Sequence, residues 1–457
     1  QFSLSAGQPT TQVTRVDVGV FAADDWRVRP NLTVSYGMRY ENQTNIHDNT
    51  NFGPRASVAW NVGKPGPKNT PSKTVLRAAA GAFYGRVNQA VTLNAARFDG
   101  NTQQSFLILN PSFFPAIPSV ASLSASKLPQ QIQYVDSSMQ AGHTYQMTAG
   151  VDRQLSKSAR LSLTYINARG VHLSRSRNIN APLAGIFPFQ DRQVRLLTES
   201  TGFSRQQSLT LTPSVNYKKW SIAGYYTFSQ GKNDPEGQPA DPYNLRAEWG
   251  PAGFADIHHR VLLQVTLPPI KKFQLSLSYQ FSSAPPFNIV IGRDLNGDSV
   301  VSERPGLVPF SAANCTGSTL VYKPSYGCFD LNPVAGSAIS RNWGRGVSSS
   351  NTPVALLTRS WTLGKKEKKS GPEEMVTVNA PGGTTVRVPA SMVGGVASGN
   401  KRQYVLQFTI QAQNPFNHTT YTAPSGDLSS PFFGVFRTTG NGSTYNRRID
   451  LQLRLNF

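Results

Sequence analysis

The end of the chain alternates strictly between apolar and polar side chains. The apolar members are Ile449, Leu451, Leu453, Leu455 and Phe457, and the polar members are Arg448, Asp450, Gln452, Arg454 and Asn456. A period of two residues predicts a β-strand with one apolar face and one polar face. A transmembrane β-barrel needs this pattern, because each strand shows apolar side chains to lipid and polar side chains to the lumen. We therefore expect an all-β chain that forms a transmembrane antiparallel β-barrel.

Similar alternation recurs along the chain and predicts about thirteen membrane strands. The expected strands are Thr14–Arg27, Leu32–Asn42, Gly53–Val62, Thr74–Gly85, His143–Leu155, Ala159–Ala168, Phe203–Tyr217, Trp220–Gln230, His258–Leu267, Phe273–Ser283, Val354–Leu363, Tyr404–Ala412 and Tyr445–Phe457. Pro-rich or aperiodic segments between them, such as Arg86–Gly142, are expected to be loops.

Short and long connections alternate between these strands. Long loops are expected at Arg86–Gly142, Arg169–Gly202 and 284–353, the last being the largest. This alternation is typical of outer-membrane barrels, which have short periplasmic turns and long extracellular loops. Four tryptophans, Trp26, Trp60, Trp220 and Trp361, lie at the short-turn ends, where an interfacial aromatic girdle belongs.

One connection departs from this pattern. Residues 364–402 are expected on the periplasmic side, yet this connection is long. The sequence MVTVNAPGGTTVRVP inside it predicts a small hairpin that turns at PGG.

The strand number bears on how the chain begins. A bacterial barrel normally has an even number of strands, whereas the expected number here is odd. Gln1 is not an initiator methionine, and no signal peptide follows it. We therefore expect the whole of residues 1–457 to be a partial barrel without a plug domain, preceded by further strands in the native protein.

Composition agrees with a barrel. Hydrophobic residues make up 38% of the chain and its mean hydropathy is −0.33, with no apolar run long enough for a membrane helix. The net charge of +21 favours a solvated lumen and headgroup-facing turns, or else attraction of anionic solutes. Because the arginines are dispersed along strands and turns, a nucleic-acid partner is not expected.

Catalytic motifs are missing from the sequence. No HExxH, GxSxG or phosphate-binding loop is present. His258 and His259 begin a strand, where adjacent side chains point to opposite faces and cannot clasp one metal ion. We expect no catalytic residues and no enzyme activity.

Two features of the largest loop are candidate sites. Asp294, Asn296 and Asp298 have the spacing of oxygen ligands in a calcium loop, although a plain turn is the competing interpretation. Pro305 stands where a bidentate Glu would be expected, with Glu303 nearby. Cys315 and Cys328 are the only cysteines, and an oxidising compartment favours a disulfide between them over free thiols or metal ligation. No other cofactor is expected.

Six stretches resemble a known family. They are Asp24–Trp26 followed by RPNLTVSYGMRYE, NFGPR at Asn51–Arg55, GRDLNGD at Gly292–Asp298, RNWGRG at Arg341–Gly346, NPFNHT at Asn414–Thr419 and LSSPFFG at Leu428–Gly434. In this order they resemble the C-terminal barrel portion of TonB-dependent outer-membrane receptors of the Oar-like type, which carry a carboxypeptidase-regulatory-like domain. The resemblance implies a 22-stranded barrel, of which this chain would hold about thirteen strands.

The resemblance also implies a function. Such receptors import scarce ligands, such as a siderophore, an oligosaccharide or a peptide, when periplasmic TonB pulls on a plug that this chain lacks. Outer-membrane lipid and lipopolysaccharide would surround the barrel, and the basic lumen suggests an anionic ligand, bound by extracellular loops whose residues the sequence does not identify. A porin-like passive channel and a soluble all-β adhesin stay open as alternatives.

Overall fold

The computed structural model of the protein describes most of the chain. The described residues are 2–8, 10–63, 73–108, 131–253, 255–298, 300–309, 311–346, 350–363, 375–379, 385–389, 404–419, 421, 423–436 and 446–456, with isolated positions 113, 116, 119 and 122.

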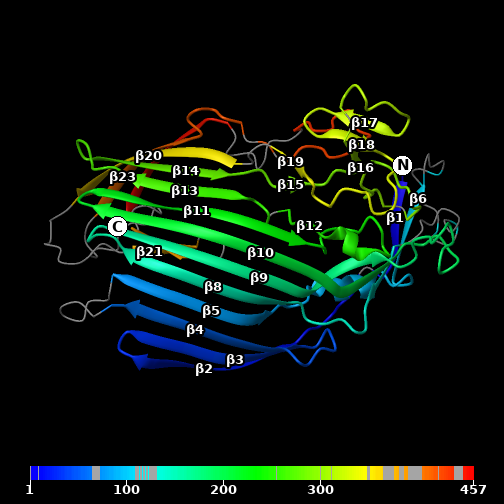
Figure 1. Ribbon diagram of the computed structural model, residues 1–457, viewed down its shortest axis with the longest axis horizontal. Helices are drawn as coiled ribbons and strands as arrows, with labels where there is room; N and C mark the ends of the chain where they lie inside the picture. The colour runs from blue at the N-terminus through cyan, green and yellow to red at the C-terminus, as the bar shows by residue number, and fades with distance from the viewer. Residues whose placement is uncertain are drawn as a thin grey trace.

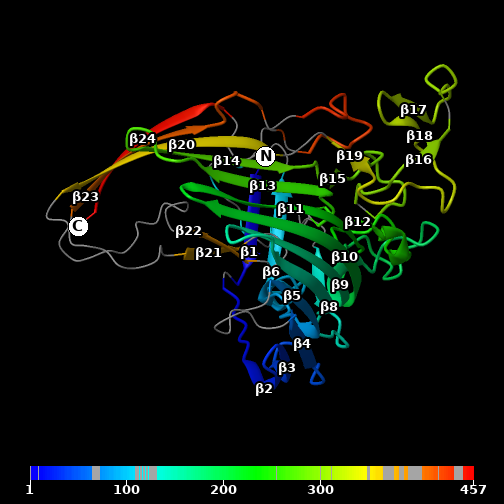
Figure 2. The same cartoon turned by 60° about the vertical axis from the view of Figure 1, so that its left-hand side comes forward.

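One antiparallel sheet dominates the structure, and its strands follow one another in chain order (Figure 1). Its path contains thirteen strands, so the predicted number is confirmed. They are β2 (Asp17–Arg29), β3 (Leu32–Gln43), β4 (Phe52–Val62), β5 (Thr74–Tyr84), β8 (His143–Gln154), β9 (Ala159–Asn178), β10 (Arg195–Tyr217), β11 (Trp220–Asn233), β13 (His259–Thr266), β14 (Phe273–Ser282), β20 (Ser350–Leu363), β23 (Tyr404–Gln413) and β24 (Arg448–Asn456). The sheet curves along its path from β2 to β24 (Figure 2).

The two faces of this sheet differ as the alternation predicts. On β10, Leu209 and Leu211 are exposed, whereas Thr210 between them and Ser208 before them are buried. On β24 the apolar residues Ile449, Leu451, Leu453 and Leu455 are 52–70% exposed. Because exposed leucines in a continuous row are stable only against an apolar medium, this outward face is the lipid face of a membrane barrel.

The expected loop at Arg169–Gly202 is wrong over much of its length. Strand β9 continues to Asn178 and β10 starts at Arg195, with register shifts between Glu199 and Ser204. These extensions have the sequences RGVHLSRSRN and RLLTESTGFS, in which apolar and polar side chains do not alternate regularly. The alternation that marks a membrane strand is therefore lost there, although the backbone still pairs.

The segment between β5 and β8 contains structure that alternation does not predict. Helix α1 (Gln89–Arg97) starts at Asn88, whose side chain accepts a hydrogen bond from the Ala90 N–H at 3.0 Å. Strand β6 (Gln103–Ile108) pairs with β1 (Phe2–Gly7), and β7 (Ile132–Val135) adds to β10 in parallel. In the described part of the chain, no helix has the length and apolar content needed to cross a membrane.

Three loops at one end of the sheet pack together. We call residues 234–258, 284–346 and 414–436 the cap. Its elements are η3 (Leu245–Glu248), β12 (Gly250–Pro251), β15 (Pro286–Phe287), β16 (Gly306–Val308), β17 (Leu320–Lys323), β18 (Gly327–Asp330) and β19 (Gly344–Arg345). Its small hydrophobic core contains Phe287, Ile289, Phe329, Ile339 and Leu428. The cap is therefore a packed unit and not a set of independent loops.

Within residues 364–402, the described part consists of two strands. Strands β21 (Met375–Asn379) and β22 (Thr385–Pro389) pair antiparallel, with Met375 opposite Pro389 and Asn379 opposite Thr385. The rest of this connection lies outside the described residues.

Candidate functional site

Buried ion pairs join the loops of the cap. The Arg304 guanidinium donates to both carboxylate oxygens of Glu248, at 2.9 and 2.8 Å, and both side chains are almost fully buried. Its Nε also donates to the Ile339 carbonyl at 3.1 Å. A buried ion pair is stable only when further hydrogen bonds satisfy both charges, as they do here. This pair fixes the 284–346 loop onto the 234–258 loop.

The RNWGRG stretch, Arg341–Gly346, also joins the loops of the cap. Arg341 donates from Nε to the Glu248 carbonyl at 3.1 Å and from Nη2 to the Asn233 carbonyl at 2.6 Å, and it pairs with Glu236. Arg345 donates to the Asp256 carbonyl at 2.9 Å and pairs with the Asp256 carboxylate. The two arginines of this motif therefore hold the cap loops together.

Cys315 and Cys328 form a disulfide inside the largest loop, with their Cα atoms 5.8 Å apart. Cys328 belongs to β18, the central strand of the small sheet β16–β18–β17, and is fully buried. The bond ties the segment before β17 to this sheet. It therefore limits the conformations available to the outermost part of the cap.

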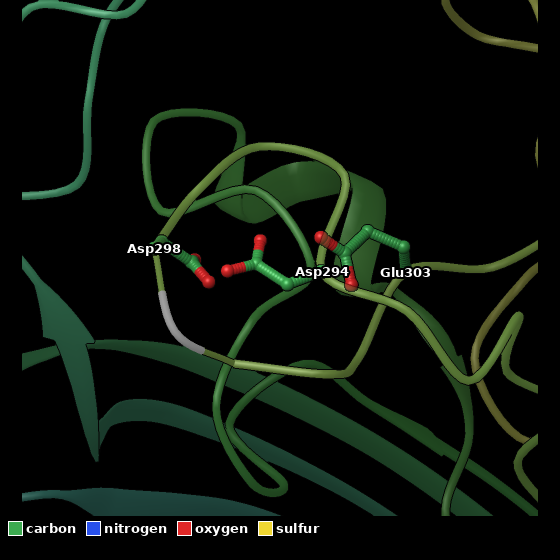
Figure 3. Close-up of side chains that lie close together, drawn as sticks. All are labelled: Asp294, Asp298 and Glu303. Atoms are coloured by element: carbon green, nitrogen blue, oxygen red, sulfur yellow. The ribbon is translucent and has the colours of Figure 1, made fainter.

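Three carboxylates gather at the base of the same loop (Figure 3). One oxygen from each of Asp294, Asp298 and Glu303 lies within 4.8 Å of the others. Asp298 and Glu303 are buried, whereas Asp294 is exposed. Hard carboxylate oxygens at this density are suited to Ca²⁺.

The electrostatics of this cluster disfavour three free negative charges. The pKa of the Asp298 carboxyl is raised to about 6, mainly by burial and to a smaller extent by the neighbouring charges of Asp294 and Glu303. Hydrogen bonds from the Val300 N–H and the Asn296 side chain act in the opposite direction but are outweighed. A proton or a cation would relieve this repulsion.

Asn296 has another role in the described conformation. Its Oδ1 accepts the Asp298 N–H at 3.0 Å, and its Nδ2 donates to the Ala240 carbonyl at 3.0 Å. The side chain thus links the acidic turn to the 234–258 loop. The third carboxylate of the cluster comes from Glu303 and not from the predicted position of Asn296. The spacing of Glu303 from Asp294 does not match a calcium loop. The calcium site at Asp294, Asn296 and Asp298 stays a prediction.

A groove of about 750 Å³ lies along strands β2 to β8. Across these strands Ala23, Gly37, Arg55, Gly81 and Gln146 are direct neighbours on the face opposite the lipid-facing side chains. Small side chains in this row leave the groove open.

Two guanidiniums provide charge in this groove. Arg55 lies over the Phe83 ring at 4.5 Å from its centroid, and Arg39 lies 6.0 Å from the centroid of Phe21. Arg39 also pairs with Glu41, with 2.6 Å between Arg39 Nε and Glu41 Oε1, and Asp24 and Asp25 line the same groove. The groove therefore offers charges of both signs next to aromatic surface.

Comparison with known proteins agrees with this geometry. A family model described as an outer membrane beta barrel domain matches residues 1–51 and 45–450. The chain belongs to this family. Membership places the protein in the bacterial outer membrane and agrees with the lipid-facing rows of the sheet.

Solved structures resemble the chain at low sequence identity. The outer membrane transporter YddB from Escherichia coli has a TM-score of 0.50 and 10% identity, over 96% of this chain and 44% of YddB. The FrpB iron transporter from Neisseria meningitidis (F3-3 variant) has a TM-score of 0.47 and 10% identity, over 96% of this chain and 45% of FrpB. The chain thus spans less than half the length of either. Comparison with curated protein sequences finds no match.

Proposed function

We propose that the protein supplies the barrel wall and the binding loops of an outer-membrane receptor of the TonB-dependent type. Its substrate would be a scarce ligand such as a siderophore, an oligosaccharide or a peptide. Energy for import would come from TonB, acting through a plug that the described residues do not include.

The rigid packing of the cap is the main observation that supports this proposal. Its loops are locked by a hydrophobic core, the Arg304–Glu248 pair and the Cys315–Cys328 disulfide. A rigid scaffold under surface loops is what specific recognition requires. The fold shared with YddB, described as an outer membrane transporter, agrees with transport.

A passive channel of porin type is the second candidate. The groove, which is lined by charges of both signs, would line a water-filled path for ions. A passive channel, however, gains nothing from a cap whose loops are fixed to one another by buried ion pairs. A soluble adhesin is not pursued, because the family is one of membrane barrels.

Two measurements on the native protein separate these functions. In planar bilayers, a receptor should give no persistent conductance steps, whereas a porin-like channel should conduct steadily. In cells, uptake of labelled ferric siderophores, maltooligosaccharides and tetrapeptides should be compared with and without TonB. The proposal requires that uptake of at least one of these ligands is lost without TonB. Persistent conductance together with TonB-independent uptake would refute it.

A further inference from the structure

Basic side chains form a row on the outward face of β9, β10 and β11. Arg205 lies directly opposite Arg169 on one side and opposite Lys232 on the other. All three residues are exposed. They share the face of Leu209 and Phe228, because each lies an even number of residues from a lipid-facing neighbour.

Side chains that lie opposite one another on β9, β10 and β11 form successive rows. Their order along the strands gives the position of the basic row relative to the apolar rows. Leu209 lies opposite Tyr165 and Phe228, and Gln207 in the next row lies opposite Asn167 and Gln230. The row of Arg205 follows. At about 3.3 Å per residue and a tilt of about 40°, Arg205 lies about 10 Å nearer the outside than Leu209. The sequence of rows from apolar to amide to basic matches the passage from hydrocarbon to headgroups.

A cavity of about 860 Å³ opens beside this row. It is lined by Arg169 and Arg205, by Arg175, and by Arg246 and Trp249 of the 234–258 loop, among others. Trp249 is exposed, with its ring available at the membrane surface, where tryptophan is favoured. The cavity therefore combines several guanidiniums with an amphipathic ring.

Most of this positive charge is uncompensated within the protein. Among the described residues, Arg169, Arg205, Lys232 and Arg246 form no ion pair with an acidic side chain. Asp234 also lines the cavity, but its carboxylate forms an ion pair with Arg175, with 3.4 Å between Arg175 Nη1 and Asp234 Oδ2. That Nη1 is buried and makes no hydrogen bond in the described structure. Like charges directly opposite each other destabilise a sheet, so an external anion would relieve the row.

We propose that Arg169, Arg205, Lys232 and the adjoining cavity bind the phosphate groups of an anionic outer-leaflet lipid, such as lipopolysaccharide. Guanidinium pairs are suited to phosphate because they form parallel, charge-assisted hydrogen bonds. The acyl chains would then lie over the apolar rows that contain Leu209 and Phe228. A soluble anionic cargo fits less well, because these residues share the lipid-facing side of the sheet and not the lumen side.

The test uses the native protein, purified in detergent and titrated with diphosphorylated lipid A under native mass spectrometry. The Arg169→Gln/Arg205→Gln double variant removes two charges from the row. Each basic residue near an anionic surface is worth about a fivefold change in affinity, so the double variant should bind about 25-fold more weakly. Lipid A without phosphates should bind the unaltered protein as weakly as it binds the double variant.

The matched control is the Lys157→Gln/Lys219→Gln double variant, which removes two charges at the opposite ends of the same strands. It should bind lipid A like the unaltered protein. The Arg169→Lys/Arg205→Lys variant keeps the charges and should retain most of the affinity, which guards against misfolding of the glutamine variant. Equal lipid A affinity in the glutamine variant and the control would overturn the proposal. So would inorganic phosphate that displaces the lipid at equal phosphate concentration, since the site would then take soluble anions.

Discussion

At the scale of single residues, Gly292 has a conformation and a position that only glycine can take. Its φ is +84°, in the left-handed region, and an added Cβ would collide with the side chains of Asp427 and Ser429. Gly292 starts the GRDLNGD stretch. Of the two residues whose side chains it approaches, Ser429 belongs to the LSSPFFG stretch and Asp427 directly precedes it. The backbone at Gly292 therefore lies directly against side chains at the start of the LSSPFFG stretch.

Replacing this glycine should open the cap. Gly292→Ala should lower cap stability by about 1 kcal/mol for the strained φ and by about 1–3 kcal/mol more for the collision. Gly336→Ala is the matched control, because Gly336 also has a positive φ but an added Cβ would meet nothing within 4 Å. Hydrogen exchange at the Ile291 and Leu428 amides measures the difference. Equal exchange in the two variants would contradict the close approach.

Asp298 makes cap stability depend on pH. Its pKa of about 6 in the folded cap lies above the ordinary value of 3.8, so the folded cap binds this proton more tightly than the opened cap. The resulting stabilisation is present below the ordinary pKa and is lost as pH rises through 6, on the order of 3 kcal/mol in total. In the presence of a chelator, the protection factors of the cap amides, which correct for the intrinsic rise of exchange with pH, should fall between pH 4 and pH 7. Asp298→Asn should abolish this dependence, and a variant that keeps it would exclude Asp298 as the cause.

Binding of a cation should stabilise the cap, whereas a rise in pH destabilises it. At pH 8, Ca²⁺ should slow cap exchange in the chelator-treated protein, because it would neutralise the carboxylates of Asp294, Asp298 and Glu303. Glu303→Gln should weaken the effect, and Mg²⁺ should be less effective because it demands a smaller, stricter geometry. No response to millimolar Ca²⁺ would leave the cluster as a hydrogen-bonded turn.

At the scale of elements, the cap depends on arginines that bridge separate loops. Arg304 joins Glu248, which precedes it by 56 residues. Removing one partner of a buried pair leaves an uncompensated charge in a buried site. The cap should therefore respond to this pair far more than to any exposed one.

Arg304→Met should destabilise the cap by about 3–5 kcal/mol, because Glu248 would stay buried without its main partner. Arg77→Met is the control, since Arg77 of β5 is exposed and pairs with Asp152 of β8, and neither residue belongs to the cap. Limited proteolysis within residues 284–346 measures cap opening. Similar cleavage rates for both variants would show that the buried pair does not hold the loops.

The sequence predicted the membrane strands well because lipid imposes a pattern on them. Leu32–Asn42 and Phe273–Ser283 alternate throughout, and the structure has strands there within one residue at each end. The parts of β9 and β10 between Arg169 and Gly202 were missed because their apolar and polar side chains do not alternate. The cap contacts were missed for another reason: the partners of Arg304, Arg341 and Glu303 lie on other turns or loops, and no periodicity records them. The spacing of Asp294 and Asp298 pointed to the right turn, but not to Glu303 as the third carboxylate.

At the scale of the whole molecule, the protein is a curved wall with two distinct faces and a packed cap at one end. The outward face has apolar rows through the membrane and the Arg205 row at its outer rim. The lumen face has the groove with Arg39 and Arg55. This division of faces separates the lipid from the proposed ligand path, and the proposed recognition surface is the cap at the end of the sheet.

The most direct test of this division is a spin-label scan along β10. Single cysteines at Leu209, Thr210 and Leu211 can be labelled selectively, because Cys315 and Cys328 are joined in a disulfide. In lipid bilayers, the labels at Leu209 and Leu211 should be relaxed mainly by oxygen, which dissolves in hydrocarbon. The label at Thr210 should be shielded from hydrocarbon and relaxed less by oxygen. Equal oxygen accessibility at all three positions would contradict the assignment of a lipid face and a lumen face.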